Sequence, residues 1–271
     1  MRKNLHIRLL YQESNNNIIG VNSMKIEEID AINYKNGKAT DTKEKVVKDE
    51  TITLTINGSI SRSLSAIEDS LEEFAVGYLF NENMVNSMDA IKEIKVEGTQ
   101  INAQIDDTLL KTNETVLCSD SAGGWRSKIK SVNPVESDFQ VKAEELISRI
   151  EELKDNAEIW QATGGTHVAG LVYEDKFIVK EDVSRHVAVD KVIGYGLLHG
   201  FDLSQSYVIY SGRMPADMVI KMTRAGVPIL ASNAAPANSG YNIAKKGNIT
   251  LVGFLRGQRC NIYNNQNRII F

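Results

Sequence analysis

Alternating apolar and polar residues predict a small unit of strands and one helix in the first half of the chain. Segment 51–58, TITLTING, alternates isoleucine or leucine with threonine and ends in Asn-Gly, a strong β-hairpin signal. Residues 69–70 can cap a following helix that has one apolar face. Segments 90–98 and 99–106 have the pattern of another strand pair. Together they predict a small α+β unit of the β-grasp type over residues 50–110.

The second half of the chain alternates strand-like and helix-like segments. Strands are expected at 166–173, 176–182, 206–210, 227–231 and 248–255, and helices at 141–154, 186–200, 215–226 and 236–247. Repetition of strand followed by helix predicts an α/β fold with a mostly parallel sheet and helices over its faces.

The first fifty residues are less regular. The Asn-rich start favours a flexible extension over residues 1–24, and segment 25–34 is compatible with either a helix or a strand. The charged segment 35–50 has the composition of a surface loop. We therefore expect the larger α/β domain to comprise residues 25–49 and 111–271, with the small unit inserted between them.

Composition narrows the class of protein. The chain has 271 residues, a formal net charge of −4 and a pI near 5.7, so it has no basic excess of the kind that general nucleic-acid binding requires. Its two cysteines form neither a disulfide framework nor a paired zinc-ligand spacing, which fits the cytoplasm. No apolar run approaches the roughly 20 residues that span a bilayer, so no membrane partner is expected.

Candidate chemistry begins at CSDSAGG, residues 118–124. A lone cysteine is more often a small core residue than a nucleophile. Here serine, aspartate and two glycines follow Cys118, and these residues favour turns that stay in contact with solvent. The composition therefore favours an exposed thiol at Cys118.

The ends of three expected strands carry arginines or other polar residues. Ser211, Gly212 and Arg213 follow segment 206–210, Ser232 and Asn233 follow segment 227–231, and the run from Arg256 to Arg259 follows segment 248–255. Ligands of open α/β sheets bind beyond the carboxyl ends of strands, and nearby helix N-termini would add amide donors. The pattern is typical of a phosphate or pyrophosphate site, although ordinary turns with solvated arginines would have the same sequence.

Two further polar segments can join this crevice. ATGGTH, which ends at His167, has two glycines that allow a ligand to approach the backbone. KEDVSRH contains Asp182, Arg185 and His186 at a strand-to-helix junction, where a salt-bridged helix cap is the alternative explanation. Neither segment is a Walker loop or a GxGxxG fingerprint, so neither indicates common ATP or NAD chemistry.

Taken together, these segments resemble the formate dehydrogenase accessory sulfurtransferase family (FdhD/NarQ). The resemblance is carried by ITLTING, LEEFAVGYLFNENMV, TGGTH, KEDVSRHVAVDKVIG, SGRMPADMVIKMTRAGVPIL and LVGFLRGQRCNIY, in family order over about four-fifths of the chain. It implies a cytidine-deaminase-like α/β domain with a β-grasp-like domain, and a homodimer.

The resemblance also implies a function in cofactor maturation. In this family a cysteine desulfurase loads sulfur onto a loop cysteine. The carrier then passes the persulfide sulfur to the molybdenum (or tungsten) bis(molybdopterin guanine dinucleotide) cofactor of formate dehydrogenase or a related enzyme. GDP would serve as a surrogate for the guanine ends of that cofactor.

The family motifs assign roles to residues of this chain. Cys118 aligns with the first cysteine of the family's Cys-Gly-x-Cys-Gly loop, and Ser121 replaces the second. The cofactor-contacting loop maps to Phe254, Leu255, Arg256, Gly257, Gln258 and Arg259, with His167, Asp182, Arg185, His186 and Arg213 as further candidates.

Two alternatives remain. Because Ser121 removes the second thiol, a cofactor-binding chaperone that has lost sulfur transfer is the rival function. A zinc deaminase is disfavoured, since the H-x-E and P-C-x-x-C ligand motifs are absent from the sequence, and no metal ligands are expected.

Overall fold

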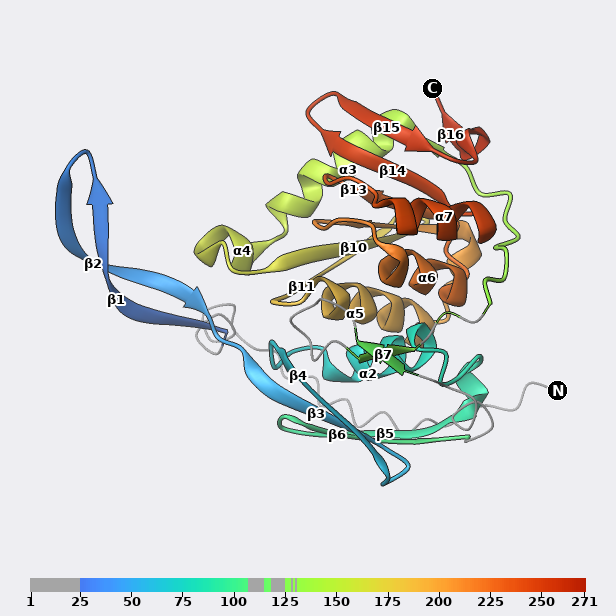
Figure 1. The fold of residues 1–271 in the computed structure, drawn as a ribbon, viewed down its shortest axis with the longest axis horizontal. Coiled ribbons are helices and arrows are strands. Elements are labelled where there is room, and N and C mark those ends of the chain that lie inside the picture. Colours follow the sequence, from blue (N-terminus) through green and yellow to red (C-terminus); the bar gives the residue numbers. More distant parts are fainter. Residues whose placement is uncertain (1–24, 107–114, 118–124, 128, 130) are drawn as a thin grey trace.

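The computed structural model describes residues 25–106, 115–117, 125–127, 129 and 131–271. Figure 1 shows two sheets with helices between them and one long hairpin that extends away from both. Within the described part of the chain, no helix is long and apolar enough to cross a membrane.

A six-stranded sheet organises the larger part of the molecule, in the order β11-β10-β12-β13-β14-β15. Its strands are β10 (His167–Tyr173), β11 (Lys176–Asp182), β12 (Ser206–Tyr210), β13 (Ile229–Ser232), β14 (Thr250–Arg256) and β15 (Arg259–Tyr263). The helices of this part are α3 (Ala143–Asp155), α4 (Glu158–Thr163), α5 (Arg185–Leu198), α6 (Ala216–Ala225) and α7 (Asn238–Lys246). The short strands β9 (Val141–Lys142) and β16 (Ile269–Ile270) pair beside it.

The prediction of a mostly parallel sheet is wrong, because the sheet is mixed. Only the pairs β12–β13 and β13–β14 are parallel, whereas β10–β11, β10–β12 and β14–β15 are antiparallel. Short turns at 174–175 and 257–258 join β10 to β11 and β14 to β15, and Glu174 and Gly257 both have positive φ there. A tight turn returns the chain antiparallel, whereas a parallel neighbour needs a helical crossover.

Alternation of side chains along the central strands separates two apolar layers. Tyr207 and Ile209 of β12 pack in the core on the α3 side, whereas Val208 and Tyr210 pack against α5, α6 and α7. Since successive side chains of a strand point to opposite faces, each strand joins both cores. The continuous apolar strands of the sequence thus reflect a sheet that is covered on both sides (Figure 1).

A second sheet of four strands and one helix forms the small unit. Its elements are β3 (Glu50–Ile56), β4 (Ile60–Ala66), α2 (Leu71–Asn81), β5 (Ile91–Glu97) and β6 (Gln100–Ile105), with a 3-10 turn at Met88–Ala90. The strand order is β4-β3-β6-β5, with β3 and β6 parallel at the centre. The expected hairpin, helix and strand pair are therefore all present.

Helices α2 and α5 join the two parts through glycines. A Cβ atom on Gly77 would lie 1.9 Å from the carbonyl oxygen of Asp190, and one on Gly194 would lie 1.8 Å from that of Glu73. Each glycine therefore faces the backbone of the opposite helix. Only residues without a side chain allow two helices to approach this closely.

Residues 26–47 form a hairpin and not the surface loop expected for 35–50. Strands β1 (Ile26–Lys35) and β2 (Lys38–Val47) pair antiparallel along their whole length. The turn is Asn36-Gly37, and both residues have positive φ, as the common two-residue hairpin turn requires. This is the same Asn-Gly signal that marks the hairpin at 57–58, but here the flanking strands are rich in charge because no core covers them.

The glycine contact between α2 and α5 gives the first prediction. Gly77→Ala places a methyl group against the backbone of α5, so the free energy of unfolding should fall by about 3 kcal/mol or more. Gly196→Ala is the matched control, because its Cβ would meet only the movable side-chain ends of Leu171, Leu203 and Phe201. Urea denaturation of both variants measures the difference. Equal stability of the two would contradict the close helix crossing.

Candidate functional site

Polar residues from several strands meet at one edge of the six-stranded sheet. His167 at the start of β10 pairs with Asp182 at the end of β11. On the other side of β10, Ser211 directly follows β12 and its backbone N–H donates to the Val168 carbonyl at 2.9 Å. Ser232 ends β13, opposite Tyr210 of β12. We call this row the polar edge.

His167 and Ser211 are hydrogen-bonded at the middle of the polar edge. The Nδ1 atom of His167 lies 3.1 Å from the Ser211 carbonyl, and the Ser211 hydroxyl accepts from the Val168 N–H at 2.9 Å. Burial lowers the pKa of His167, and nearby Arg185 lowers it as well, against an opposing effect of the Ser211 carbonyl. A neutral imidazole that donates from Nδ1 to this carbonyl fits both observations.

Arg185 lies across the turn that follows β12. A Cβ atom on Gly212 would lie 3.2 Å from Cδ of Arg185 and 2.7 Å from the Tyr210 ring, so glycine makes room for both side chains. Arg213 next in the chain is exposed. Its carbonyl accepts a hydrogen bond from the buried Tyr210 hydroxyl. Arg185 therefore contacts the turn that contains Arg213.

The loops after β12, β13 and within β14 are bonded to one another. The Ser232 hydroxyl donates to the Gly212 carbonyl at 2.6 Å, and the Phe254 N–H donates to the Ala234 carbonyl at 3.0 Å. The backbones of Met214 and Pro236 form a parallel bridge. The loops after β12 and β13 therefore meet each other and the backbone of Phe254 in β14, and the position of the Arg256–Arg259 turn in the same crevice stays a prediction.

Helices α5, α6 and α7 all begin at the polar edge, because each follows a strand or loop that ends there. His186 in the first turn of α5 is fully buried, with Nε2 3.5 Å from Oδ2 of Asp217 in the first turn of α6. It therefore joins two helices inside the protein. Helix N-termini stabilise anions, so this edge favours a negatively charged ligand.

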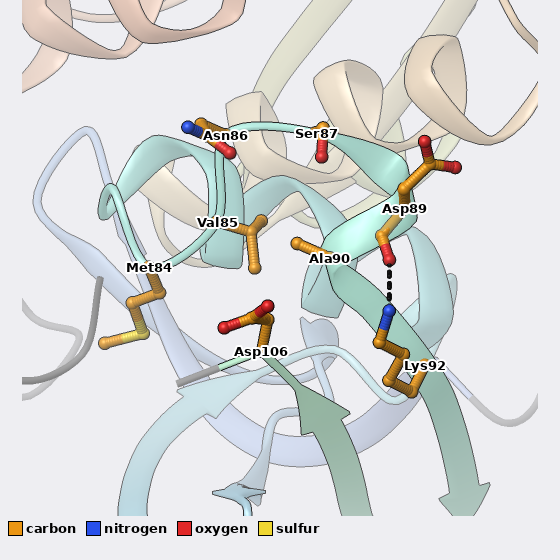
Figure 2. A pocket seen from close by; sticks show the side chains of 8 residues that line it. All are labelled: Met84, Val85, Asn86, Ser87, Asp89, Ala90, Lys92 and Asp106. Carbon is orange, nitrogen blue, oxygen red and sulfur yellow. Dashed lines mark hydrogen bonds between the residues drawn. The ribbon is translucent and has the colours of Figure 1, made fainter. Parts of the chain in front are cut away.

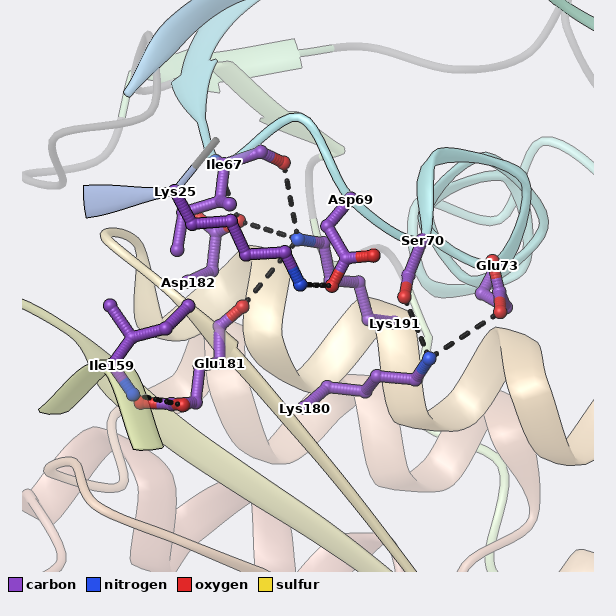
Figure 3. Close-up of polar contacts among 10 residues, drawn as sticks. All are labelled: Lys25, Ile67, Asp69, Ser70, Glu73, Ile159, Lys180, Glu181, Asp182 and Lys191. Carbon is purple, nitrogen blue, oxygen red and sulfur yellow. Dashed lines mark hydrogen bonds and ion pairs between the residues drawn. The ribbon is translucent and has the colours of Figure 1, made fainter. Parts of the chain in front are cut away.

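Asp182 is fully buried and acts within the protein. Its carboxylate accepts from Lys191 Nζ at 2.8 Å and from the Ile67 N–H at 3.1 Å (Figure 3). It also accepts from the Ser184 N–H at 3.0 Å. Lys191 is also fully buried and donates to the Ile67 carbonyl at 3.3 Å. Burial raises the pKa of Asp182, while the adjacent ammonium of Lys191 opposes that shift. This ion pair links the start of α5 to the small unit.

Glu181 holds the TGGTH segment and the start of α4 in place. Its carboxylate accepts from the N–H groups of Ile159 and Trp160 at the start of α4, and from the Thr166 hydroxyl at 2.8 Å. Gly164 ends α4 with a left-handed backbone, which is the usual place for glycine. The two glycines thus end α4 and connect it to β10.

The arginine segment 254–259 forms the bulged end of β14 and the turn into β15. Phe254 has φ of 54°, an uncommon backbone conformation for a bulky residue, and Leu255 is buried in the core on the α3 side. The four residues Arg256 to Arg259 are exposed. Leu255 therefore anchors the segment, while the two arginines are available to a ligand.

The sulfur-carrying candidate Cys118 lies outside the described residues. Strands β7 (Thr115–Leu117) and β8 (Trp125–Ser127) pair antiparallel on either side of its loop, with Leu117 opposite Trp125. Cys260 in β15 is half-buried against the α3-side core, and burial raises the pKa of its thiol. A raised pKa leaves less of the nucleophilic thiolate at neutral pH.

A pocket of about 370 Å³ lies in the small unit, away from the polar edge (Figure 2). Its walls come from the connection between α2 and β5 and from the end of β6. Asp106 points into it, near Val85 and Ala90, and Lys92 donates to the Asp89 carbonyl at 2.7 Å. Among the described residues, no group of three or more histidine, cysteine or acidic side chains is arranged to hold a metal.

Sequence reasoning missed the residues that hold the polar edge in place. Lys191 and Asp217 were not among the candidates, yet Lys191 bonds to Asp182 and Asp217 lies against His186. Ser211 and Ser232 were recognised only as members of strand-end loops, without a role of their own. Lys191 had one signal: it is a charged residue within an otherwise apolar run, VAVDKVIG, where a buried charge needs a partner.

Comparisons with known proteins agree on one family. A model described as the FdhD/NarQ family matches residues 47–270. The chain is 49% identical over 228 residues to a sulfur carrier protein FdhD of Methanothermobacter thermautotrophicus, covering 84% of this chain and 92% of the relative. It is 30% identical to one of Bacillus pumilus, covering 87% and 94%. The solved structure of a putative formate dehydrogenase accessory protein from Desulfotalea psychrophila superposes with a TM-score of 0.75 at 26% identity, covering 91% of this chain and all of the other.

The buried Asp182–Lys191 pair gives the second prediction. Lys191→Met leaves an uncompensated buried carboxylate, so the free energy of unfolding at pH 7 should fall by about 3–5 kcal/mol. Without Lys191 the pKa of Asp182 rises further above its unfolded value. The loss should therefore shrink as the pH falls and a proton neutralises the carboxyl. Denaturation at pH 7 and pH 5, with Asp182→Asn/Lys191→Met as the control, measures this. A loss independent of pH would contradict the assignment.

Proposed function

The chain belongs to the FdhD/NarQ family, and we propose that it is a sulfur carrier in the maturation of formate dehydrogenase. Its similarity over most of its length to relatives named sulfur carrier proteins carries this proposal. The polar edge supports it independently, since three helix N-termini and the exposed arginines after β12 and at the end of β14 suit a ligand with several phosphates.

Cys118 is the proposed sulfur acceptor. Its thiolate attacks the outer sulfur of a persulfide on a cysteine desulfurase, a new S–S bond forms at Cys118, and the thiolate of the desulfurase leaves. This exchange transfers one sulfur atom and needs no outside oxidant. One thiolate is sufficient for the step, so Ser121 in place of the family's second cysteine does not exclude it.

The recipient of the sulfur is proposed to be the molybdenum or tungsten bis(molybdopterin guanine dinucleotide) cofactor, bound as a substrate. Arg213, Arg256 and Arg259 are exposed and can pair with its phosphates. Phe254, two residues before Arg256, is half-buried and can contact a ring of the cofactor. Asp182 and His186 are fully buried, so they would support the site by holding α5 and α6 in place.

The finer description of the fold and its partners is part of the same proposal. The β4-β3-β6-β5 order with a parallel central pair supports a β-grasp-like unit over 50–110, and the helices on both faces of the larger sheet support a cytidine-deaminase-like domain. A homodimer in the cytoplasm, with a cysteine desulfurase and formate dehydrogenase as partners, completes it.

The rival function is a chaperone that binds the cofactor and transfers no sulfur. Ser121 favours it, because any step that needs a second thiol to relay or release sulfur would be lost. Cys260 is a poor replacement, since it is half-buried with a raised pKa. The two functions differ in the chemistry of Cys118 and share the same cofactor site.

The third prediction concerns sulfur uptake at Cys118. After incubation with a cysteine desulfurase and cysteine, the wild-type chain should gain sulfur, seen by mass spectrometry as an adduct of about 32 Da for one atom. Cys118→Ala should abolish the adduct without changing the melting temperature, whereas the control Cys260→Ala should keep it. An adduct on Cys260 in the Cys118→Ala variant would show that the carrier is misassigned.

Ser121→Cys separates the two functions. If wild type takes up sulfur and Ser121→Cys transfers it faster, a second thiol relays sulfur in this family and the chain is a slower carrier. If only Ser121→Cys takes up sulfur, the natural chain is the chaperone.

The fourth prediction tests the arginines of the 254–259 segment. Replacing both Arg256 and Arg259 by alanine removes charge-assisted donors to phosphate and should weaken GDP binding about tenfold or more. Lys245→Ala/Lys246→Ala removes the same charge from the exposed end of α7 and should leave affinity unchanged. Isothermal calorimetry measures both. Equal weakening in the two variants would mean that GDP senses only the net charge.

A further inference from the structure

The β1–β2 hairpin, residues 26–47, is exposed on all sides over most of its length. We call it the arm. It extends away from both sheets in Figure 1, and its base contacts the body, where Val47 lies against Gly165. Ile32 and Tyr34 near its tip are 71% and 75% exposed. A two-stranded hairpin alone in water is marginally stable, and its free edges can pair with another strand.

The pairing within the arm decides which side chains share a face. Ile32 lies opposite Asp41 and Asp30 lies opposite Lys43, so all four side chains point to the same side. Lys43 is 3.5 Å from Asp30, whereas Asp41 forms no ion pair with any described residue. Strand β2 therefore presents one carboxylate without an ion pair and one cation, two residues apart.

These two charges make the β2 edge complementary to itself. When two copies of β2 pair antiparallel about a two-fold axis at Thr42, Asp41 of each copy faces Lys43 of the other, and Thr40 faces Glu44. Lys43 then lies between Asp41 of the second copy and its own Asp30. Opposite charges directly across a strand pair stabilise it.

Other symmetric registers of the same edge either oppose like charges or gain no attractive pair. With a two-fold axis perpendicular to the sheet, paired residues must point to the same face. Each symmetric register is therefore centred on one residue, which lies opposite the same residue of the second copy. Centring on Asp41 opposes two carboxylates, and centring on Lys43 opposes two ammonium groups. Centring on Glu44 opposes two glutamates and brings Lys43 opposite Lys45. Centring on Thr40 opposes no like charges, but it also brings no opposite charges together within β2. Only Thr42 places opposite charges across the strand pair without opposing like charges.

We propose that the arm is an association surface for a second copy of this chain, paired through β2 edges that are centred on Thr42. The pairing gives a four-stranded sheet with Ile32 and Tyr34 of both copies on one face. It specifies the homodimer proposed above, but it does not depend on sulfur transfer, because its test measures mass and not sulfur.

Reversing the charge of Asp41 or of Lys43 in the full chain tests the proposed pairing of the two β2 edges. Asp41→Lys opposes two ammonium groups across the strand pair, because the new side chain faces Lys43 of the second copy. Lys43→Asp opposes two carboxylates in the same way, since its new side chain faces Asp41. Each single variant should therefore dimerise about tenfold more weakly than wild type or worse.

An equimolar mixture of the two variants restores both attractive pairs in the heterodimer and should dimerise again. Glu93→Lys, on the exposed strand β5, is the control with the same charge change as Asp41→Lys, and it should dimerise as wild type does.

Sedimentation velocity over a concentration series measures these masses. Weak dimers of both single variants, together with a restored dimer in the mixture, support the proposal. A monomeric wild type, or single variants that dimerise as well as wild type, would overturn it. Weak dimers in both the single variants and the mixture would also overturn it, because the register predicts rescue.

Discussion

The close contact between α2 and α5 is the constraint on which the rest of the structure depends. Gly77 and Gly194 bring the two helix backbones together. The adjacent residues Asp190 and Lys191 of α5 bond to different partners. Lys191 pairs with Asp182, and Asp190 accepts from Asn81 of α2 and from Lys221 of α6, both at 2.5 Å. These groups are almost fully buried. Removing Lys191 would leave the buried carboxylate of Asp182 without its ion-pair partner.

This contact also determines where the candidate site lies. The carboxylate of Asp182 accepts hydrogen bonds from the Ile67 N–H of the small unit and from the Ser184 N–H before α5. One carboxylate at the polar edge therefore holds both parts in position. The polar edge in turn receives loops that bond to each other through Ser232 and the turn after Tyr210. Exposed arginines are thus carried on a rigid base, which is what binding a large polyphosphate ligand with defined orientation requires.

Buried and exposed members of the same sequence motif have different tasks. In KEDVSRH, Asp182 and His186 hold helices together, whereas Arg185 is half-buried with its side chain beside Gly212. In the arginine segment, Leu255 enters the core and the residues that follow it stay in solvent. A motif that is specific to a family therefore combines residues that position the site with residues that are free to contact a ligand.

The sequence by itself determined the elements whose signal is local. The hairpin at Asn57-Gly58, the helix over 71–81 and the strand–helix alternation after residue 166 all follow from periodicity and turn chemistry. So do the arginines at strand ends, and the family motifs identified the relatives. Strand direction and burial were decided only by the tertiary structure. Whether β15 returns antiparallel, or whether Asp182 meets Lys191 or a ligand, depends on residues far apart in the chain. The charged arm shows the same limit, since alternation marks a strand only when a core covers one of its faces.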